Sequence, residues 1–280
     1  MLAPKSLAFV VAFLGLSIGC AHGADLSDGT GLSMKDTPGN YWVVTLGAYG
    51  MVEPEFLGSK DYTFSGRPII DIHAAGAREW LTLPNDAFSL TLYQTGNFRV
   101  GAAGDYLNDR THYDDPKATR GLNDIDYTLE AGAFAEYYPV PFLRTRAELL
   151  QGITGADGLA ANLMADYIYS PDPRWMFTVG PRLQIVNEQY QSAFFSVSAA
   201  EAANSGTPPL TQFHASGGLN SAGVDATARY NLTECFSIRA FGEWDRLLGD
   251  AADSPIVKQR GSADQIEVGL GAAYKFNYAW

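Results

Sequence analysis

The sequence predicts an all-β fold: one transmembrane antiparallel β-barrel over residues 41–280, with twelve strands and ten strands as the alternative. Three observations predict it: an export signal at the N-terminus, apolar and polar residues that alternate with period two, and connections that alternate in length. After the signal, no stretch reaches about 18 consecutive apolar residues, so the sequence offers no candidate for a membrane-spanning helix.

The N-terminus has the organisation of a secretory signal peptide over residues 1–23. A positive charge at Lys5 precedes an apolar run over residues 7–18, and the small residues Ala21 and Gly23 stand at the spacing that a signal peptidase accepts. The run is shorter than the roughly 20 residues that a spanning helix needs. The sequence therefore predicts export and removal of this segment.

Cleavage after Gly23 or Ala24 leaves residues 24–40 as a periplasmic N-terminal segment ahead of the barrel. Cys20 offers an alternative, in which it is the lipidated first residue of a lipoprotein, although the preceding Ser-Ile-Gly lacks the usual leucine three residues before the cysteine. Acidic residues outnumber basic ones by 31 to 19, which argues against nucleic acid as a partner.

The strands are predicted from alternation. From Ile266 to Trp280 the even positions are apolar and end in aromatics, whereas the odd positions are small or polar. Alternation sustained over about ten residues indicates a strand with one apolar and one polar face. The segments with this pattern are 41–50, 66–74, 77–83, 87–95, 97–105, 126–138, 142–151, 158–170, 174–187, 219–231, 234–247 and 265–280. The third and fourth of them also fit one bent strand.

The connections between successive predicted strands alternate between short and long. The predicted tight turns are 75–76, 96–97, 138–141, 170–173 and 231–234. The predicted long loops are 51–65, 106–125, 152–157, 188–218 and 248–264. This parity, with a short connection at Pro84-Asn85 as its exception, is typical of outer-membrane barrels whose termini both lie on the periplasmic side. Closure is also what hydrocarbon requires, because a closed barrel pairs every backbone N–H and C=O group.

The inward face is predicted to be charged. Alternation assigns to the lumen Arg67, Asp71, His73, Arg99, Glu130, Glu136, Arg144, Arg146, Glu148, Asp166, Arg182, Asp225, Arg229, Arg239, Glu243, Glu267 and Lys275. Both signs occur in similar numbers, which indicates a salt-bridged, hydrated lumen rather than a pore selective for one sign. A twelve-stranded barrel is wider than an eight-stranded one filled by side chains and narrower than a sixteen-stranded porin, so we expect a narrow, partly blocked channel.

No catalytic, cofactor-binding or metal site is predicted. Asp71 and His73 fall on one face of a strand, after Ser65, but such a pair is common by chance and serves in a charged lumen as one more hydrogen-bonding partner. The acidic stretches 108–115 and 249–253 are expected to be solvated loops. Binding of Ca²⁺, or of cations that bridge to lipopolysaccharide phosphates, is the alternative for them.

Three stretches carry a family resemblance. They are EPEFLGSKDY (53–62), NEQYQSAFFSVSAAEAANSG (187–206) and LGDAADSPIV (248–257), the last followed by QRGSADQIEVGLGAAYKF. In order, they resemble the first loop, the large loop and the C-terminal signature of the MltA-interacting protein (MipA)/OmpV family of outer-membrane proteins. Two departures from that pattern are Phe56, where the family has tyrosine, and Ser196, where glycine is expected.

The end of the chain resembles a second pattern. Tyr274, Phe276, Tyr278 and Trp280 resemble the C-terminal signal that the barrel-assembly machinery reads, with tryptophan in place of the commoner phenylalanine. The resemblance therefore implies that this machinery is a partner during assembly.

The family resemblance implies a protein of the Gram-negative cell outer membrane, in contact with membrane lipid and lipopolysaccharide. It implies a non-enzymatic scaffold that links a lytic transglycosylase to a penicillin-binding protein during peptidoglycan synthesis. A narrow channel for small solutes is the alternative function, and an adhesin is the third.

A periplasmic enzyme cannot reach extracellular loops, so a scaffold surface is expected at the short turns or in residues 24–40. The stretch Asp253-Ser254-Pro255 is a natural start for a turn, because the aspartate caps the backbone and the proline fixes φ. We expect it to fold onto the barrel mouth, with an extracellular contact surface as the alternative.

Overall fold

The computed structural model describes residues 41–74, 80–112 and 116–279. Its strands are β1 (Tyr41–Pro54), β2 (Tyr62–Ala74), β3 (Phe88–Gln94), β4 (Phe98–Leu107), β5 (Thr128–Val140), β6 (Leu143–Gly152), β7 (Leu159–Tyr169), β8 (Trp175–Val186), β9 (Gly218–Asn231), β10 (Phe236–Leu247) and β11 (Asp264–Ala279). Its helical segments are α1 (Glu188–Phe195), α2 (Ala199–Asn204), α3 (Gly249–Asp253) and a π-helical turn, η1 (Ile256–Arg260). The predicted signal peptide, the segment 24–40 and Trp280 lie outside the described residues.

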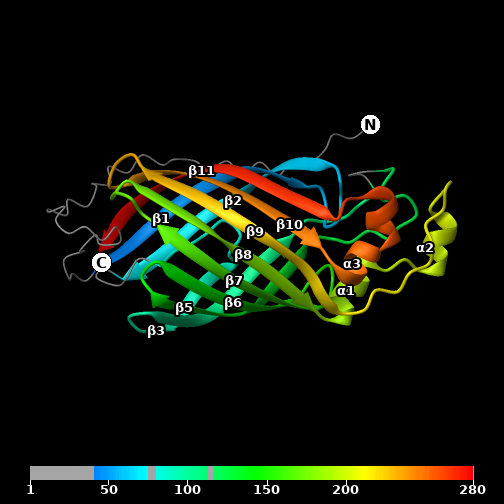
Figure 1. Ribbon diagram of the computed structural model, residues 1–280, viewed down its shortest axis with the longest axis horizontal. Helices are drawn as coiled ribbons and strands as arrows, with labels where there is room; N and C mark the ends of the chain where they lie inside the picture. The colour runs from blue at the N-terminus through cyan, green and yellow to red at the C-terminus, as the bar shows by residue number, and fades with distance from the viewer. Residues whose placement is uncertain (1–40, 75–79, 113–115, 280) are drawn as a thin grey trace.

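The strands form one antiparallel sheet that curls into a barrel, with the helices gathered at one end (Figure 1). The strand order is β2-β1-β11-β10-β9-β8-β7-β6-β5-β4-β3. The first strand pairs with the last from Tyr41 opposite Ala279 to Val52 opposite Val268. Among the described residues, no helix has the length and apolar character needed to cross a membrane.

The sheet is apolar outside and charged inside. Along β6, Arg144, Arg146 and Glu148 are buried, whereas Ala147 and Leu149 are exposed. The exposed apolar side chains include Leu46, Ile70, Leu90, Leu129, Leu163, Val179, Ile238 and Leu270. Apolar residues outside and charges inside reverse the arrangement of a water-soluble protein, and they suit a wall surrounded by hydrocarbon.

The two ends of the barrel differ in the length of their connections. The short-turn end carries residues 95–97, 141–142, 170–174 and 232–235. The long-loop end carries residues 55–61, 108–127, 153–158, 187–217 and 248–263. Exposed aromatic side chains gather near the short-turn end, at Tyr137, Phe142, Tyr167, Tyr169 and Trp175. Such rings suit the boundary between lipid and water.

The described residues contain eleven strands, where twelve were predicted. The difference is the strand predicted over residues 77–83: residues 80–87, which we call the inner segment, form no strand and pass through the lumen. The neighbouring side chains Trp80 and Leu81 are both buried, so the segment does not alternate, and Pro84 has no N–H to give to a ladder. Residues 75–79 lie outside the described residues.

The path of the inner segment leaves a seam in the wall. Because neighbouring strands are antiparallel throughout the order, β2 and β3 at its two ends run in the same direction, and no ladder joins them within the described ranges. Side chains cross the seam instead. The Tyr106 hydroxyl donates to the Gly66 carbonyl at 3.4 Å, Arg67 Nη1 donates to the Pro84 carbonyl at 2.9 Å, and the Arg67 guanidinium lies 5.5 Å from the centre of the Tyr106 ring.

The packing of the inner segment predicts a difference between two leucine-to-alanine substitutions. Leu83 is 3% exposed inside the barrel, whereas Leu90 is 65% exposed on its outer face. We expect Leu83→Ala to lower the free energy of unfolding by about 2–5 kcal/mol, because it leaves a cavity. Leu90→Ala should cost clearly less, because lipid or detergent fills the space. Equilibrium unfolding in denaturant, with the barrel in lipid vesicles, checks this, and equal losses would contradict the buried position.

Candidate functional site

Buried ion pairs fill the middle of the lumen. We call this set the lumen ion network; it consists of Arg99, Arg144, Arg146, Arg182, Asp86, Glu136, Glu148, Asp166 and Asp225. Asp86 comes from the inner segment and the other members come from strands β4 to β9. None is more than 8% exposed.

Arg144 lies at the centre of the network. Its Nη2 donates to Asp86 at 2.6 Å and to Glu136 at 2.9 Å, and its Nη1 donates to Asp166 at 2.8 Å. Arg144 is fully buried. Hydrogen bonds between charged groups offset the cost of desolvating them when several form at once, and both terminal nitrogens of this guanidinium bind carboxylates.

The network continues on both sides of Arg144. Arg146 contacts Glu136 at 3.2 Å and Glu148 at 2.7 Å. On the other side, Arg182 contacts Asp166 at 2.7 Å and Asp225 at 3.1 Å. Since Glu136 binds three arginines and Asp166 binds two, the pairs form one connected set rather than separate salt bridges.

The inner segment is bound to this network through its backbone. The Ala87 N–H donates to Glu148 at 3.0 Å, and Arg146 Nη2 donates to the Ala87 carbonyl at 3.1 Å. Arg99 donates to the Leu81 carbonyl at 3.4 Å and lies 5.0 Å from the centre of the Trp80 ring. A segment outside any ladder still needs partners for its polar groups, and the lumen arginines and Glu148 supply them.

Below the network, toward the short-turn end, the lumen is filled by apolar side chains. Trp80, Leu81 and Leu83 pack against side chains of three wall strands. The wall residues are Tyr138 of β5, Ile168 of β7 and Met176 of β8. The Leu81 N–H donates to the Tyr138 hydroxyl at 3.2 Å, so this tyrosine points inward. Charged and apolar layers together fill the lower half of the barrel.

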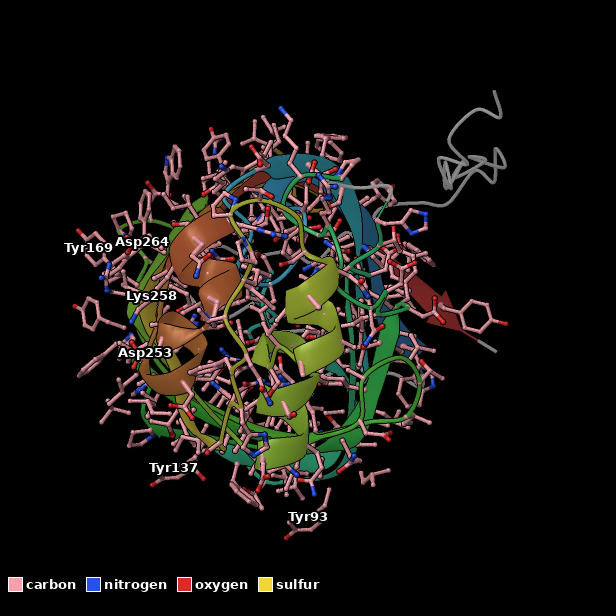
Figure 2. All side chains as sticks on the ribbon, turned by 90° about the vertical axis from the view of Figure 1, so that its right-hand side faces the viewer. Tyr93, Tyr137, Tyr169, Asp253, Lys258 and Asp264 are labelled. Atoms are coloured by element: carbon pink, nitrogen blue, oxygen red, sulfur yellow. The ribbon has the colours of Figure 1, made fainter. Side chains whose placement is uncertain are left out.

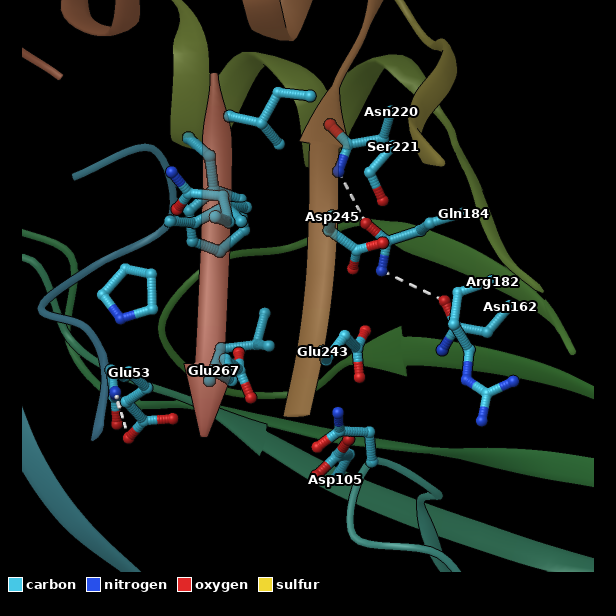
Figure 3. Close-up of a pocket in the computed structure, with 18 of the residues that line it drawn as sticks. Glu53, Asp105, Asn162, Arg182, Gln184, Asn220, Ser221, Glu243, Asp245 and Glu267 are labelled. Carbon is cyan, nitrogen blue, oxygen red and sulfur yellow. Dashed lines mark hydrogen bonds between the residues drawn. The ribbon is translucent and has the colours of Figure 1, made fainter. Parts of the chain in front are cut away.

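Above the network, toward the long-loop end, the lumen holds a cavity of about 220 Å³ (Figure 3), which we call the upper cavity. Its charged lining residues are Glu53, Asp105, Glu243, Asp245, Glu267, Arg67 and Arg182. Amide side chains connect its wall to the network: Asn220 donates to Gln184 at 2.6 Å, Gln184 to Asn162 at 3.0 Å, and Asn162 to Glu148 at 3.2 Å. The upper cavity is therefore polar and rich in carboxylates.

Helices cover the barrel mouth at the long-loop end (Figure 2). A cluster of buried apolar residues joins α1, α3 and the upper wall, and it includes Tyr190, Phe194, Phe195, Leu247, Ala251 and Val257. Arg110 Nη1 donates to the Phe194 carbonyl at 2.7 Å, and burial lowers the pKa of Arg110 to about 10. The cover is thus a packed layer with its own core.

The three stretches that carry the family resemblance meet in this cover. Gly58 adopts φ +93°, which favours glycine, and an added Cβ would lie a tight 3.0 Å from Val257 Cγ2 and 3.5 Å from Phe195 Cε1. The Ser254 hydroxyl donates to the Phe195 carbonyl at 2.7 Å, and both Ser254 and Ile256 are buried. The stretch around Ser254 therefore folds onto the mouth.

The structure buries most of the residues that were predicted to face the lumen. The buried ones are His73, Arg99, Glu130, Glu136, Arg144, Arg146, Glu148, Asp166, Arg182, Asp225 and Arg239, and the half-buried ones are Arg67, Asp71, Arg229, Glu243, Glu267 and Lys275. Four further acidic residues face the lumen but were not predicted to do so from alternation: Glu53, Asp86, Asp105 and Asp245. Asp105 and Asp245 share the parity of Arg99 and Arg239 on the same strands, so following the alternation to the strand ends would have found them. Asp86 belongs to no strand.

The C-terminal aromatics lie on β11, next to β1. Tyr274 lies opposite Leu46, and Tyr278 lies opposite Trp42. Tyr274 and Phe276 are half-buried, with their ring centres 6.5 Å apart, and Tyr278 is exposed. The predicted role of this stretch as an assembly signal stays a prediction.

The Asp71–His73 pair lies on the lumen side of β2, away from Ser65. Asp71 Oδ2 and His73 Nδ1 are 2.8 Å apart. Ser65 belongs to the same strand but precedes Asp71 by roughly 20 Å of extended chain. The pair therefore acts as a local hydrogen bond.

The acidic stretches do not assemble into a metal site in the described part of the chain, where no group of three or more His, Cys, Asp or Glu side chains is arranged to hold a metal ion. The stretch 249–253 forms α3, and its Asp253 pairs with Lys258 at 2.8 Å on the surface. Residues 113–115 of the other stretch lie outside the described residues.

A family model described as "MltA-interacting protein MipA" matches residues 46–276 of the chain. The chain belongs to the MipA family. The resemblance found in the sequence is thereby confirmed, and with it the location in the Gram-negative outer membrane. In such barrels the short-turn end faces the periplasm and the long-loop end faces the cell exterior.

Solved structures that resemble this MipA-family chain are outer-membrane proteins. An outer membrane channel from Pseudomonas putida F1 shares 10% identity at a TM-score of 0.42, over 90% of this chain and 100% of that one. The outer membrane channel DcaP of Acinetobacter baumannii shares 9% identity at a TM-score of 0.37, over 84% and 96%. The N-terminal barrel domain of Pseudomonas aeruginosa OprF shares 11% at a TM-score of 0.30, over 84% and 97%. No curated protein matches the chain.

The lumen ion network predicts a large cost for removing its central arginine. Arg144→Met should lower the free energy of unfolding by about 3–5 kcal/mol, because it leaves the buried carboxylates of Asp86, Glu136 and Asp166 short of a partner. The matched control is Arg246→Met, since Arg246 and its partner Asp264 are 52% and 46% exposed, and such a pair contributes about 0–1 kcal/mol. Denaturant titration of both variants in lipid vesicles compares them, and a small loss for Arg144→Met would contradict the central role.

Proposed function

We propose that this MipA-family protein is a non-conducting, non-enzymatic barrel that serves as a scaffold at the inner face of the outer membrane. Its partners in this proposal are a lytic transglycosylase and a penicillin-binding protein, which it holds near each other during peptidoglycan synthesis. The family's name, MltA-interacting protein, supports the first partner.

The observation that carries the proposal is the filled lumen. The inner segment, its apolar contacts and the lumen ion network occupy the periplasmic half of the barrel, and packed helices cover the opposite mouth. A barrel built in this way offers solutes no evident path. The surfaces left for function are then its two ends and its lipid-facing wall.

The short-turn end is the surface that periplasmic enzymes can reach. The turn at 170–174 is pre-formed, because Asp172 accepts hydrogen bonds from the N–H groups of Arg174 and Trp175, at 2.8 and 3.0 Å. Pro171 and Pro173 beside it are exposed. The predicted turn that contains Tyr138 is less suitable for testing, since this tyrosine supports the inner segment.

The proposal assigns no reaction to the chain. General base catalysis requires a histidine within hydrogen-bonding reach of a nucleophile or water and of its substrate. His73 contacts Asp71 in a wall that faces a filled lumen, with Ser65 far along the strand. Hydrolytic activity of the purified barrel that is lost in His73→Ala would contradict this part of the proposal.

Exchange of the short turns tests the scaffold directly. We expect the folded barrel to retain a purified lytic transglycosylase in a pull-down, and to lose it when residues 171–173 and 232–234 are replaced by glycine and serine. The control is Asp253→Asn with Lys258→Gln, which alters exposed side chains at the opposite end. Retention by the turn variant, or equal loss in the control, would contradict a periplasmic docking surface.

A narrow channel is the second candidate, and the upper cavity is the observation that favours it, because it hollows the outer half of the lumen. Planar bilayers separate the two functions. We expect no steady conductance from the native barrel, and steady currents when residues 80–87 are replaced by a glycine–serine segment of equal length, which removes the apolar filling. Steady, solute-dependent currents from the native protein would favour the channel instead.

A further inference from the structure

The upper cavity has an unbalanced charge. Five carboxylates line it, from Glu53, Asp105, Glu243, Asp245 and Glu267, against the guanidinium groups of Arg67 and Arg182. Arg182 already contacts Asp166 and Asp225 below the cavity. Among the described lining residues, Arg67 is therefore the cation that no other carboxylate binds. None of the five carboxylates forms an ion pair within 4.0 Å in the described part of the chain, with Arg67 or with any other residue.

Buried oxygen atoms in the same cavity lack hydrogen-bond donors. Asn220 is 0% exposed, and it donates through Nδ2 to Gln184 while its Oδ1 has no partner. Glu243 Oε2 and Asp245 Oδ1 are likewise buried without a donor from another residue, and the two carboxyl groups lie within hydrogen-bonding reach of each other. An unsatisfied buried acceptor costs free energy, so a ligand that brings N–H groups to these oxygen atoms would be bound favourably. Figure 3 shows the three residues on neighbouring strands of one wall.

The carboxylates are spread round the cavity rather than gathered at one point. Glu53 and Asp105 lie on β1 and β4, whereas Glu243 and Asp245 lie on β10 (Figure 3). In the parts of the chain that are described, no three acidic side chains are placed to hold one metal ion. Separate carboxylates fit a ligand whose positive charges are themselves separated.

The cavity also has an apolar part. Phe56, Leu57, Leu107, Leu247, Tyr190 and Phe194 line it toward the cover. A ligand that suits both parts carries ammonium groups for the carboxylates and methylene groups for the apolar side chains.

We propose that the upper cavity binds an aliphatic polyamine, with its ammonium groups donating to Glu243, Asp245 and Asn220 on one side and to carboxylates of the opposite wall on the other. This site lies in the outer half of the lumen and is independent of the periplasmic scaffold surface. The bound cation neutralises the excess negative charge and supplies the missing donors.

The test is titration of the full-length folded barrel in detergent with spermidine, followed by calorimetry at low ionic strength. We expect saturable binding of one spermidine per barrel. Glu243→Gln with Asp245→Asn should weaken it by about tenfold or more, because neutral amides of the same shape replace charged acceptors. The matched control is Asp157→Asn with Asp253→Asn, which removes two exposed carboxylates outside the cavity and should leave binding unchanged.

Two further titrations distinguish the ligand class. A neutral diol of matched chain length should not bind, because it lacks the charge. Mg²⁺ alone should not bind saturably at this site. The polyamine assignment is overturned if Mg²⁺ binds to the native barrel but not to the double variant, and spermidine does not bind. Absence of spermidine binding, or equal weakening in the control, also overturns it.

Heat-modifiable migration on a gel confirms that each variant is folded before it is titrated. If the double variant does not fold, the single change Glu267→Gln on the neighbouring strand β11 replaces it, with the same expected direction. Failure of spermidine to bind leaves the scaffold unaffected, since the pull-down depends on the opposite end of the barrel.

Discussion

The contacts of one buried guanidinium hold the interior of this barrel together. Arg144 binds Asp86 of the inner segment, Glu136 of β5 and Asp166 of β7. These carboxylates come from three separate parts of the chain. Removing it would leave three buried carboxylates each short of one cationic partner. The inner segment has no ladder of its own, so it stays in the lumen only while the wall arginines bind its carbonyls and Asp86.

This arrangement explains why the barrel has a filled lower half and a hollow upper half. Below Arg144, Trp80 and Leu83 occupy the space that water would fill in a porin. Above it, the wall residues continue to alternate inward, and carboxylates and amides face an open volume that Asn85 of the inner segment also borders. The packed cover then closes the exterior side, and the family's three sequence stretches form its contacts around Gly58.

The sequence predicted the wall well because period-two alternation and turn parity are local properties. Eleven of the twelve predicted segments overlap strands of the observed wall along most of their length, and those for β6 and β7 agree to within a residue or two. It failed at Trp80-Leu81-Thr82-Leu83, where an apolar run reads as a strand but packs inside the barrel. No local pattern distinguishes these outcomes, since the choice depends on Arg99 and Arg146, which are distant in sequence. Asp105 and Asp245 were missed for a simpler reason, because they lie at strand ends.

The seam between β2 and β3 exists because the residues that could close it lie inside the barrel. A run of residues that continued from β2 in the wall, antiparallel to both neighbours, would make the cylinder even-numbered and join these edges by backbone hydrogen bonds. Because these residues lie in the lumen instead, the contacts across the seam are made by the side chains of Arg67 and Tyr106. The inner segment can either complete the wall as a strand or block the lumen, but it cannot do both. In this protein it blocks the lumen.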